Sequence, residues 1–142
     1  MDKKQASIVE LCKPIKYCIK CRLSQTRQNV VCGEGNLHPR LMLVALSPGK
    51  NEDREGKMFI GPSGKILDEL LQSAGIKRNS IYMTNLIKCM LPKNRRPKQD
   101  EIEACSHFLD EEIMVFRRRA FGKKMESITR TRCCRMETLM KD

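Results

Sequence analysis

The sequence predicts an α/β fold organised around a parallel sheet. Residues 41–46 form an uninterrupted apolar run, which a loop containing Pro48 and Gly49 closes. Such a run is typical of a buried strand of a parallel sheet. Residues 63–71 then show the spacing of a helix, and a second apolar strand is expected to end at Asn85. Ligands of such sheets bind at the carboxyl ends of the strands, which is where the loops after both strands leave.

The remaining elements follow from local signals. Residues 6–11 predict a helix that ends before Pro14, because proline disfavours helical geometry in the residue before it. Residues 29–35 predict a short strand and turn. Asp100 is expected to cap the last helix, with Glu103 at the capping-box position. The helix after residue 63 is expected to pack one apolar face into the core, formed by Ile66, Leu67, Leu70 and Leu71.

The charge of the chain favours a polyanionic partner. Its net charge is +11, which suits DNA or RNA. From Val115 to Asp142 there are nine Lys or Arg against three Asp or Glu, so this segment carries more than half of the excess. No helical or strand period continues there. We therefore divide the 142 residues into a folded part, 1–114, and a basic tail, 115–142, that is poorly ordered or foreign to the fold.

The cysteines depend on the compartment. The sequence contains no apolar run of membrane-spanning length and no hydrophobic signal region after Met1, so we expect a cytoplasmic protein without a membrane contact. In a reducing compartment the eight cysteines are expected to be metal ligands, reactive thiols or core residues rather than disulfides.

Four cysteines form a candidate metal centre. Cys18 and Cys21 lie in one Cys-x-x-Cys turn, whereas Cys89 and Cys105 bracket a basic loop rich in proline. Four thiolates from two distant segments can hold a structural zinc ion or an iron–sulfur cluster, and their spacing does not choose between the two. Two further cysteines are candidates to substitute for one of the four: Cys12 and Cys32.

Several segments together resemble the family 4 (type 4) uracil-DNA glycosylases, the iron–sulfur members of the uracil-DNA glycosylase superfamily. The matching motifs are Cys-x-x-Cys-x-Leu at 18–23, Val-x-Gly-Glu-Gly at 31–35, Pro-Gly-x-x-Glu-Asp-x-x-Gly at 48–56, and the segments 59–64, 82–85 and 88–89. The resemblance covers about two thirds of the chain. It implies a three-layer α/β/α sandwich, a [4Fe-4S] cluster on the four cysteines (with zinc as the alternative), and hydrolysis of the N-glycosidic bond of uracil in DNA during base excision repair.

A pocket for uracil needs an aromatic face, a group that reads the edge of the base, and donors for the charge on the leaving base. Phe59 is expected to supply the aromatic face. The amide of Asn85 both donates and accepts, which matches the O4 and N3–H edge of uracil. The backbone of Leu46 and Ser47 is expected to line the other side. Glu52 is the candidate catalytic residue, which would orient water or stabilise the cationic sugar.

Three cations of the basic loop are expected to contact DNA phosphates: Lys93, Arg95 and Arg96. Each pocket residue also has a plainer interpretation. Phe59 would be a core residue, Asn85 would cap a turn, and Glu52 and Asp53 would be solvated acids of a loop.

Two departures from the family pattern put the catalytic competence of the chain in question. Ala45 and Leu46 stand where the family usually has Gly-Glu. No segment matches the family's His-Pro-Ser loop, and His107 does not take the place of its histidine. A truncated or frame-shifted coding sequence would give this pattern. The second hypothesis is therefore a non-catalytic iron–sulfur module, or an inactive fragment of the family, that binds DNA. Under either hypothesis we expect a monomer whose partner is uracil-containing DNA.

Overall fold

The computed structural model describes residues 3–117, and its centre is a three-stranded sheet. β3 (Tyr82–Asn85) lies between β1 (Glu34–Gly35) and β2 (Met42–Ala45). β2 runs parallel to β3, whereas β1 runs antiparallel to it. The α/β class is confirmed, but the sheet is mixed rather than purely parallel. The reason is the short connection between β1 and β2, since a parallel crossover needs a dozen or more residues.

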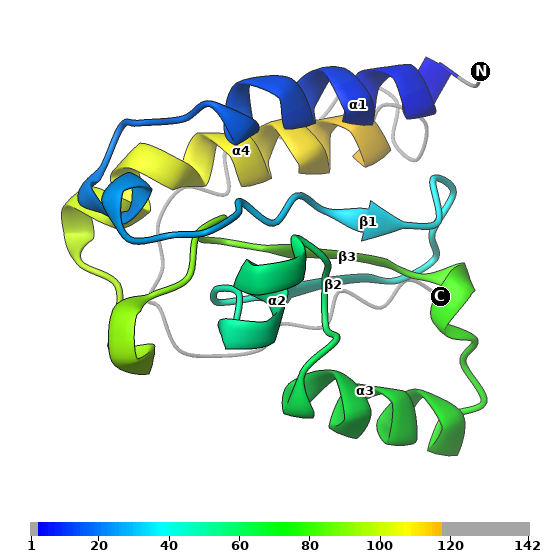
Figure 1. Ribbon diagram of the computed structural model, residues 1–142. Helices are drawn as coiled ribbons and strands as arrows, with labels where there is room; N and C mark the ends of the chain where they lie inside the picture. The colour runs from blue at the N-terminus through cyan, green and yellow to red at the C-terminus, as the bar shows by residue number, and fades with distance from the viewer. Residues whose placement is uncertain (1–2, 118–142) are drawn as a thin grey trace.

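Helices cover both faces of this sheet, as Figure 1 shows. α1 (Lys3–Lys16) and α4 (Gln99–Arg117) pack against each other on one face, and α2 (Lys50–Glu55) and α3 (Pro62–Ser73) lie on the other. The elements therefore stack in the predicted α/β/α order. Single turns of 3₁₀ helix join them: η1 (Arg22–Gln25), η2 (Arg78–Ser80) and η3 (Pro92–Asn94).

Two apolar cores hold the layers together. The core under α1 and α4 contains Ile15, Leu23, Ile87, Cys89, Leu91, Cys105 and Phe108. The core between the sheet and α3 contains Val31, Met58, Leu71, Ile81 and Met83. Fully burying one large apolar side chain contributes about 1.5–3 kcal/mol, so both cores fix the sheet from which the loops of the site leave. The whole of β3 is buried, whereas the residues of β2 are half-buried, because β2 is the edge strand of the described sheet.

The boundaries of two helices differ from the sequence prediction. α1 continues through Pro14 to Lys16. The proline lies in the last turn, so it removes only one N–H from the helix, and buried Ile15 anchors the residues around it. At the start of α4, the Lys98 backbone N–H donates to Glu101 Oε2 at 2.8 Å. The acid that reaches back over the first turn is therefore Glu101, two residues before the predicted capping-box acid.

The predicted apolar face of α3 is only half correct. Leu71 is buried and Leu67 is half-buried, whereas Ile66 and Leu70 are 59% and 58% exposed. The apolar stripe of α3 is wider than the part of the helix that reaches the sheet. The prediction that all four residues belong to the core is therefore wrong for these two.

The predicted boundary after residue 114 falls inside α4, which runs to Arg117. The rest of the predicted basic tail lies outside the described residues, so the division of the chain into two parts stays a prediction. Within residues 3–117, no helix combines the length and the apolar character that crossing a bilayer requires.

Candidate functional site

A cavity of about 520 Å³ opens where the loops leave the carboxyl ends of β2 and β3. The loop after β2 and the start of α2 form one wall, and the segment around Phe59 forms another. Asn85 and Asn94 come from the β3 side. The lining residues are Ala45, Ser47, Pro48, Gly49, Lys50, Asn51, Glu52, Met58, Phe59, Pro62, Ser63, Asn85 and Asn94.

Asn85 is the last residue of β3 and is 2% exposed. Its side-chain Nδ2 donates to Met58 Sδ at 3.1 Å. A thioether sulfur is a weak acceptor, so the carbonyl group of a ligand would be a better partner for this amide. Asn85 therefore brings a buried donor and acceptor to the cavity.

Phe59 lines the cavity and also packs, half-buried, against the core between the sheet and α3. The core interpretation and the pocket interpretation of this residue are thus compatible. Its backbone has a φ of +50°, which is rare for a bulky residue. A residue in such a region carries strain of about 1–3 kcal/mol, and strain of this kind clusters at binding sites.

Glu52 and Asp53 are both buried, so the interpretation of these two as solvated acids is wrong. Oε1 of Glu52 accepts the backbone N–H groups of Ile60 at 2.9 Å and Gly61 at 2.7 Å. The Asp53 carboxylate accepts backbone N–H groups of the segment at residues 28–29. Glu52 therefore lines the cavity and at the same time holds the segment that follows Phe59.

The predicted residues Ser47 and Leu46 have different positions. Ser47 lines the cavity, whereas Leu46 is not among the lining residues. The side chain of Leu46 is 43% exposed, and its carbonyl accepts the N–H of Ile87 at 2.9 Å. The structure thus brings Ser47, Glu52, Phe59 and Asn85 together and leaves Leu46 beside them.

The three cations of the basic loop also differ. Lys93 and Arg96 are exposed. Arg95 donates through both terminal nitrogens to Glu101, at 2.8 and 2.5 Å, and this bidentate pair lowers the pKa of Glu101 to about 2. Arg95 is therefore engaged in an ion pair within the protein. Lys93 and Asn94 both have positive φ, and the turn that they form places Asn94 at the cavity. The sequence indicated only an irregular loop here.

The four predicted cysteines are free thiols that line one small cavity of about 10 Å³ under α1 and α4. Cys89 and Cys105 are buried, and Cys18 and Cys21 are half-buried. Burial raises the pKa of Cys105 to about 11 and also raises that of Cys89. In residues 3–117 no three Cys, His, Asp or Glu side chains are gathered closely enough to hold a metal ion.

Two N–H groups reach the sulfur atoms of this cavity. The backbone N–H of Lys88 donates to Cys105 Sγ at 3.3 Å, and Nη1 of Arg27 donates to Cys89 Sγ at 3.3 Å. Both bonds lower the pKa of the thiol that accepts them and so oppose the effect of burial. The surroundings of the four sulfurs therefore contain donors suited to thiolates.

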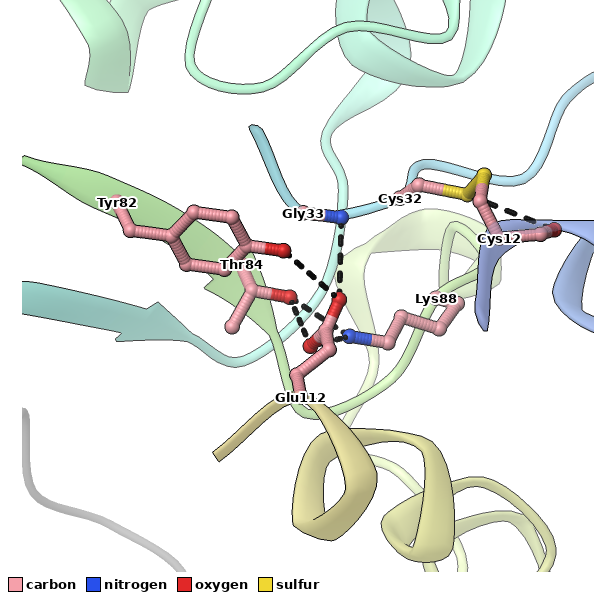
Figure 2. Close-up of a disulfide and its surroundings, with 7 residues drawn as sticks. All are labelled: Cys12, Cys32, Gly33, Tyr82, Thr84, Lys88 and Glu112. Carbon is pink, nitrogen blue, oxygen red and sulfur yellow. Dashed lines mark hydrogen bonds and ion pairs between the residues drawn. A yellow bond between two sulfur atoms is a disulfide. The ribbon is translucent and has the colours of Figure 1, made fainter. Parts of the chain in front are cut away.

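Cys12 and Cys32 form a disulfide, which Figure 2 shows between α1 and the segment before β1. Their Cα atoms are 5.9 Å apart. The expectation that the cysteines avoid disulfides is wrong for this pair, because the fold brings two thiols 20 positions apart in sequence into bonding geometry. Neither residue is then available as a substitute metal ligand.

A buried ion pair lies beside this disulfide, and sequence reasoning missed it (Figure 2). Lys88 is 1% exposed, and its Nζ donates to Glu112 Oε2 at 2.7 Å, Thr84 Oγ1 at 2.7 Å and the Asn85 carbonyl at 2.8 Å. Burial lowers the pKa of Lys88, and Glu112 opposes this effect. Glu112 also accepts bonds from Gly33 N–H, Tyr82 OH and Thr84 OH. The available signal was helical spacing, which puts residue 112 on the same face of α4 as residues 105 and 108.

The fold and the cavity define an α/β domain with a ligand pocket at the carboxyl edge of its sheet, and comparison with known proteins gives its family. The model of the uracil DNA glycosylase superfamily matches residues 32–128, so the chain belongs to this superfamily. It is 45% identical over 101 residues to the type-4 uracil-DNA glycosylase of Thermotoga maritima, covering 71% of this chain and 53% of that protein.

Other relatives are also matched over about half of their length. The type-4 uracil-DNA glycosylase of Saccharolobus solfataricus is 44% identical over 104 residues, covering 72% of this chain and 48% of that protein. The type-5 uracil-DNA glycosylase of Thermus thermophilus is 31% identical over 97 residues, covering 58% and 44%. The chain thus spans about half the length of the curated relatives it matches.

Proposed function

We propose that this protein is a uracil-DNA glycosylase, which releases uracil from DNA by hydrolysing the N-glycosidic bond in base excision repair. The observation that carries the proposal is the cavity at the end of the sheet, where an aromatic ring and a buried amide face the same space. Membership of the superfamily and the names of the type-4 relatives support it.

The proposed reaction begins with a uracil that has left the base stack and entered the cavity. Phe59 would stack on the ring, and Asn85 would accept from N3–H and donate to O4. As the bond to the sugar breaks, the base gains negative charge, and preorganised donors lining the cavity would stabilise it. The backbone of Ser47 is our candidate for that role, whereas Leu46 does not line the cavity.

Glu52 is the proposed catalytic residue. Its carboxylate lines the cavity, where two backbone N–H groups hold Oε1 in place. A fixed carboxylate can orient a water molecule towards the sugar carbon, or stabilise the positive charge that develops on the sugar. Substituting Glu52 by Gln keeps both N–H bonds, so a loss of rate without a loss of folding would support this role.

Lys93 and Arg96 are the proposed phosphate contacts. Both side chains are exposed on the loop that brings Asn94 to the cavity. Phosphate contacts of this kind release counterions, so substituting Lys93 or Arg96 by Gln should weaken DNA binding and reduce its salt dependence. Arg95 is a weaker candidate because Glu101 occupies both of its terminal nitrogens.

We further propose that the four free cysteines hold a [4Fe-4S] cluster. All four line one cavity, and Arg27 and the backbone of Lys88 supply N–H donors to two of the sulfurs. Because no three metal-ligating side chains of residues 3–117 are gathered closely enough to hold a metal ion, the proposal requires the four thiols to draw together around the cluster. Burial raises the pKa of the Cys89 and Cys105 thiols, so the positive charge of bound iron would be needed to hold them as thiolates. The cluster would be structural, tying the turn at Cys18 to the Cys89 loop.

Anaerobic purification separates the two cofactors. Brown protein with visible absorption and about four iron atoms per chain is the expected result. Colourless protein with stoichiometric zinc would contradict the cluster and support the alternative.

The test of the activity is uracil release from an oligonucleotide, followed by alkaline cleavage at the abasic site. Asn85→Ala should lower the rate about a hundredfold or more, since a buried group that reads the substrate is lost. Asn79→Ala is the matched control, because Asn79 is an exposed asparagine on η2, away from the cavity lining. Equal rates for the two variants would contradict the assigned pocket.

A second candidate function is a non-catalytic iron–sulfur module that binds DNA, which the replacement of the family's usual carboxylate by Leu46 favours. Phe59→Ala separates the candidates. Under the first function the variant should lose uracil binding, whereas under the second it should bind DNA as the wild type does and neither protein should bind uracil. The proposal also includes a cytoplasmic monomer, which light scattering and cell fractionation would test.

A further inference from the structure

The strained backbone at Phe59 needs an explanation. Its φ of +50° is unfavourable for an aromatic residue, and such a conformation persists only where the surroundings hold it. Two neighbours are fixed: Met58 is buried in the core below α3, and Gly61 is held by Glu52. Glu52 also accepts the N–H of Ile60 at 2.9 Å, which is the N–H of the peptide that follows Phe59. These contacts leave the carbonyl oxygen of that peptide to be held by another group.

Arg78 holds the carbonyl side of that peptide. Its Nη2 donates to the carbonyl oxygens of both Met58, at 3.0 Å, and Phe59, at 2.9 Å. Its Nη1 donates to Asp68 on α3 at 2.6 Å. Arg78 comes from η2, far from Phe59 in sequence, and one planar guanidinium makes all three bonds. A lysine has no such fork.

The first turn of α3 also contacts the Phe59 carbonyl. A Cβ atom at Gly64 would lie 1.8 Å from the carbonyl oxygen of Phe59. The first turn of α3 therefore packs directly on this carbonyl, with no side chain between. Gly64 and Arg78 thus both contact the Phe59 carbonyl, and the aromatic ring of the same residue lines the cavity.

We propose that Arg78 is a positioning residue for base recognition: its grip on the two carbonyl groups fixes the Phe59 ring at the wall of the cavity. The inference rests on the proposed function and extends it to a residue that does not line the cavity. Holding the ring before the base arrives removes the cost of ordering it during binding.

The binding test compares four proteins: wild type, Arg78→Met, Arg78→Lys and Asp68→Asn. Free uracil is titrated calorimetrically into each. Arg78→Met should bind uracil about tenfold more weakly, the cost of ordering one side chain, with KM raised and kcat little changed. Arg78→Lys should recover part of the loss. Asp68→Asn is the matched control, because it removes the ion pair and leaves both carbonyl bonds, so it should bind as the wild type does.

A second readout does not depend on uracil. In isotopically labelled protein, the backbone coupling constant and the Cα chemical shift of Phe59 report its φ. The left-handed values should disappear in Arg78→Met and remain in Asp68→Asn. Unchanged values in Arg78→Met, or the same change in both variants, would overturn the proposal. If the values depend on Arg78 but wild-type protein neither binds nor releases uracil, the positioning stands and the proposed function fails.

Discussion

The buried pair of Lys88 and Glu112 offers the sharpest prediction about stability. Substituting Lys88 by Met keeps the length of the side chain and removes the charge and three hydrogen bonds. Breaking a buried ion pair costs about 3–5 kcal/mol, because the remaining charge is left uncompensated. Here Glu112 retains three donors, from Gly33, Tyr82 and Thr84. We therefore expect the lower end of the range, about 3 kcal/mol.

Urea unfolding followed by circular dichroism measures this loss at pH 7. A domain of this size has a total stability of about 5–15 kcal/mol, so the midpoint of Lys88→Met should shift clearly. Lys65→Met is the matched control, because Lys65 is an exposed lysine on α3 and should change stability by less than about 0.5 kcal/mol. Glu112→Leu and the double variant complete a thermodynamic cycle.

The cycle should be strongly non-additive, because the second substitution removes a charge that the first left unpaired. The double variant should be more stable than the sum of the two single losses implies, although the donors of Gly33, Tyr82 and Thr84 would then lack their acceptor. Lys88→Met within about 0.5 kcal/mol of the Lys65→Met control, or additive losses in the cycle, would refute this account of the pair.

Three further predictions concern stability. Glu101→Gln should lose about 2 kcal/mol of stability at neutral pH, where Arg95 stabilises the charged form of Glu101. Because folding lowers the pKa of Glu101 from 4.5 to about 2, this stabilisation is complete above pH 4.5 and is lost as the pH falls towards 2. The urea midpoints of the two proteins should therefore converge over that range. Cys12→Ser should cost about 3 kcal/mol by opening a 20-residue loop, and reductant should lower wild type to the same midpoint. Gly64→Ala should cost about 1–3 kcal/mol in a thermal melt despite the helix preference of alanine, since the new Cβ meets the Phe59 carbonyl; a gain in stability would contradict that contact.

The sequence predicted the elements that depend on local pattern. The apolar runs before Ser47 and through Asn85 became β2 and β3, and the loops after them meet at one cavity. The Cys-x-x-Cys turn and the two later cysteines line a second cavity. The strands and their cavity follow from periodicity and from the rule that ligands bind at the carboxyl ends of parallel strands, whereas the cysteine set came from the Cys-x-x-Cys spacing and the family resemblance.

Other features depend on tertiary contacts that no local pattern contains. The sequence is compatible with Arg95 pairing with a DNA phosphate or with a protein carboxylate, and the folded structure pairs it with Glu101. The exposure of Ile66 depends on how far the sheet extends beneath α3. The positive φ of Phe59 depends on Arg78, which comes from another part of the chain. The last two outcomes depend on parts of the chain that are distant in sequence, whereas the pairing of Arg95 depends on the turn that precedes α4.

The central claim is that the cavity recognises uracil for release from DNA. The most direct test incubates the anaerobically purified wild-type protein with single-stranded oligonucleotides that carry one labelled uracil or one labelled cytosine at the same position. The account predicts release of free uracil and no release of cytosine. No uracil release from folded, brown protein that still binds the oligonucleotide would contradict it, and would leave a DNA-binding iron–sulfur module as the function of this chain.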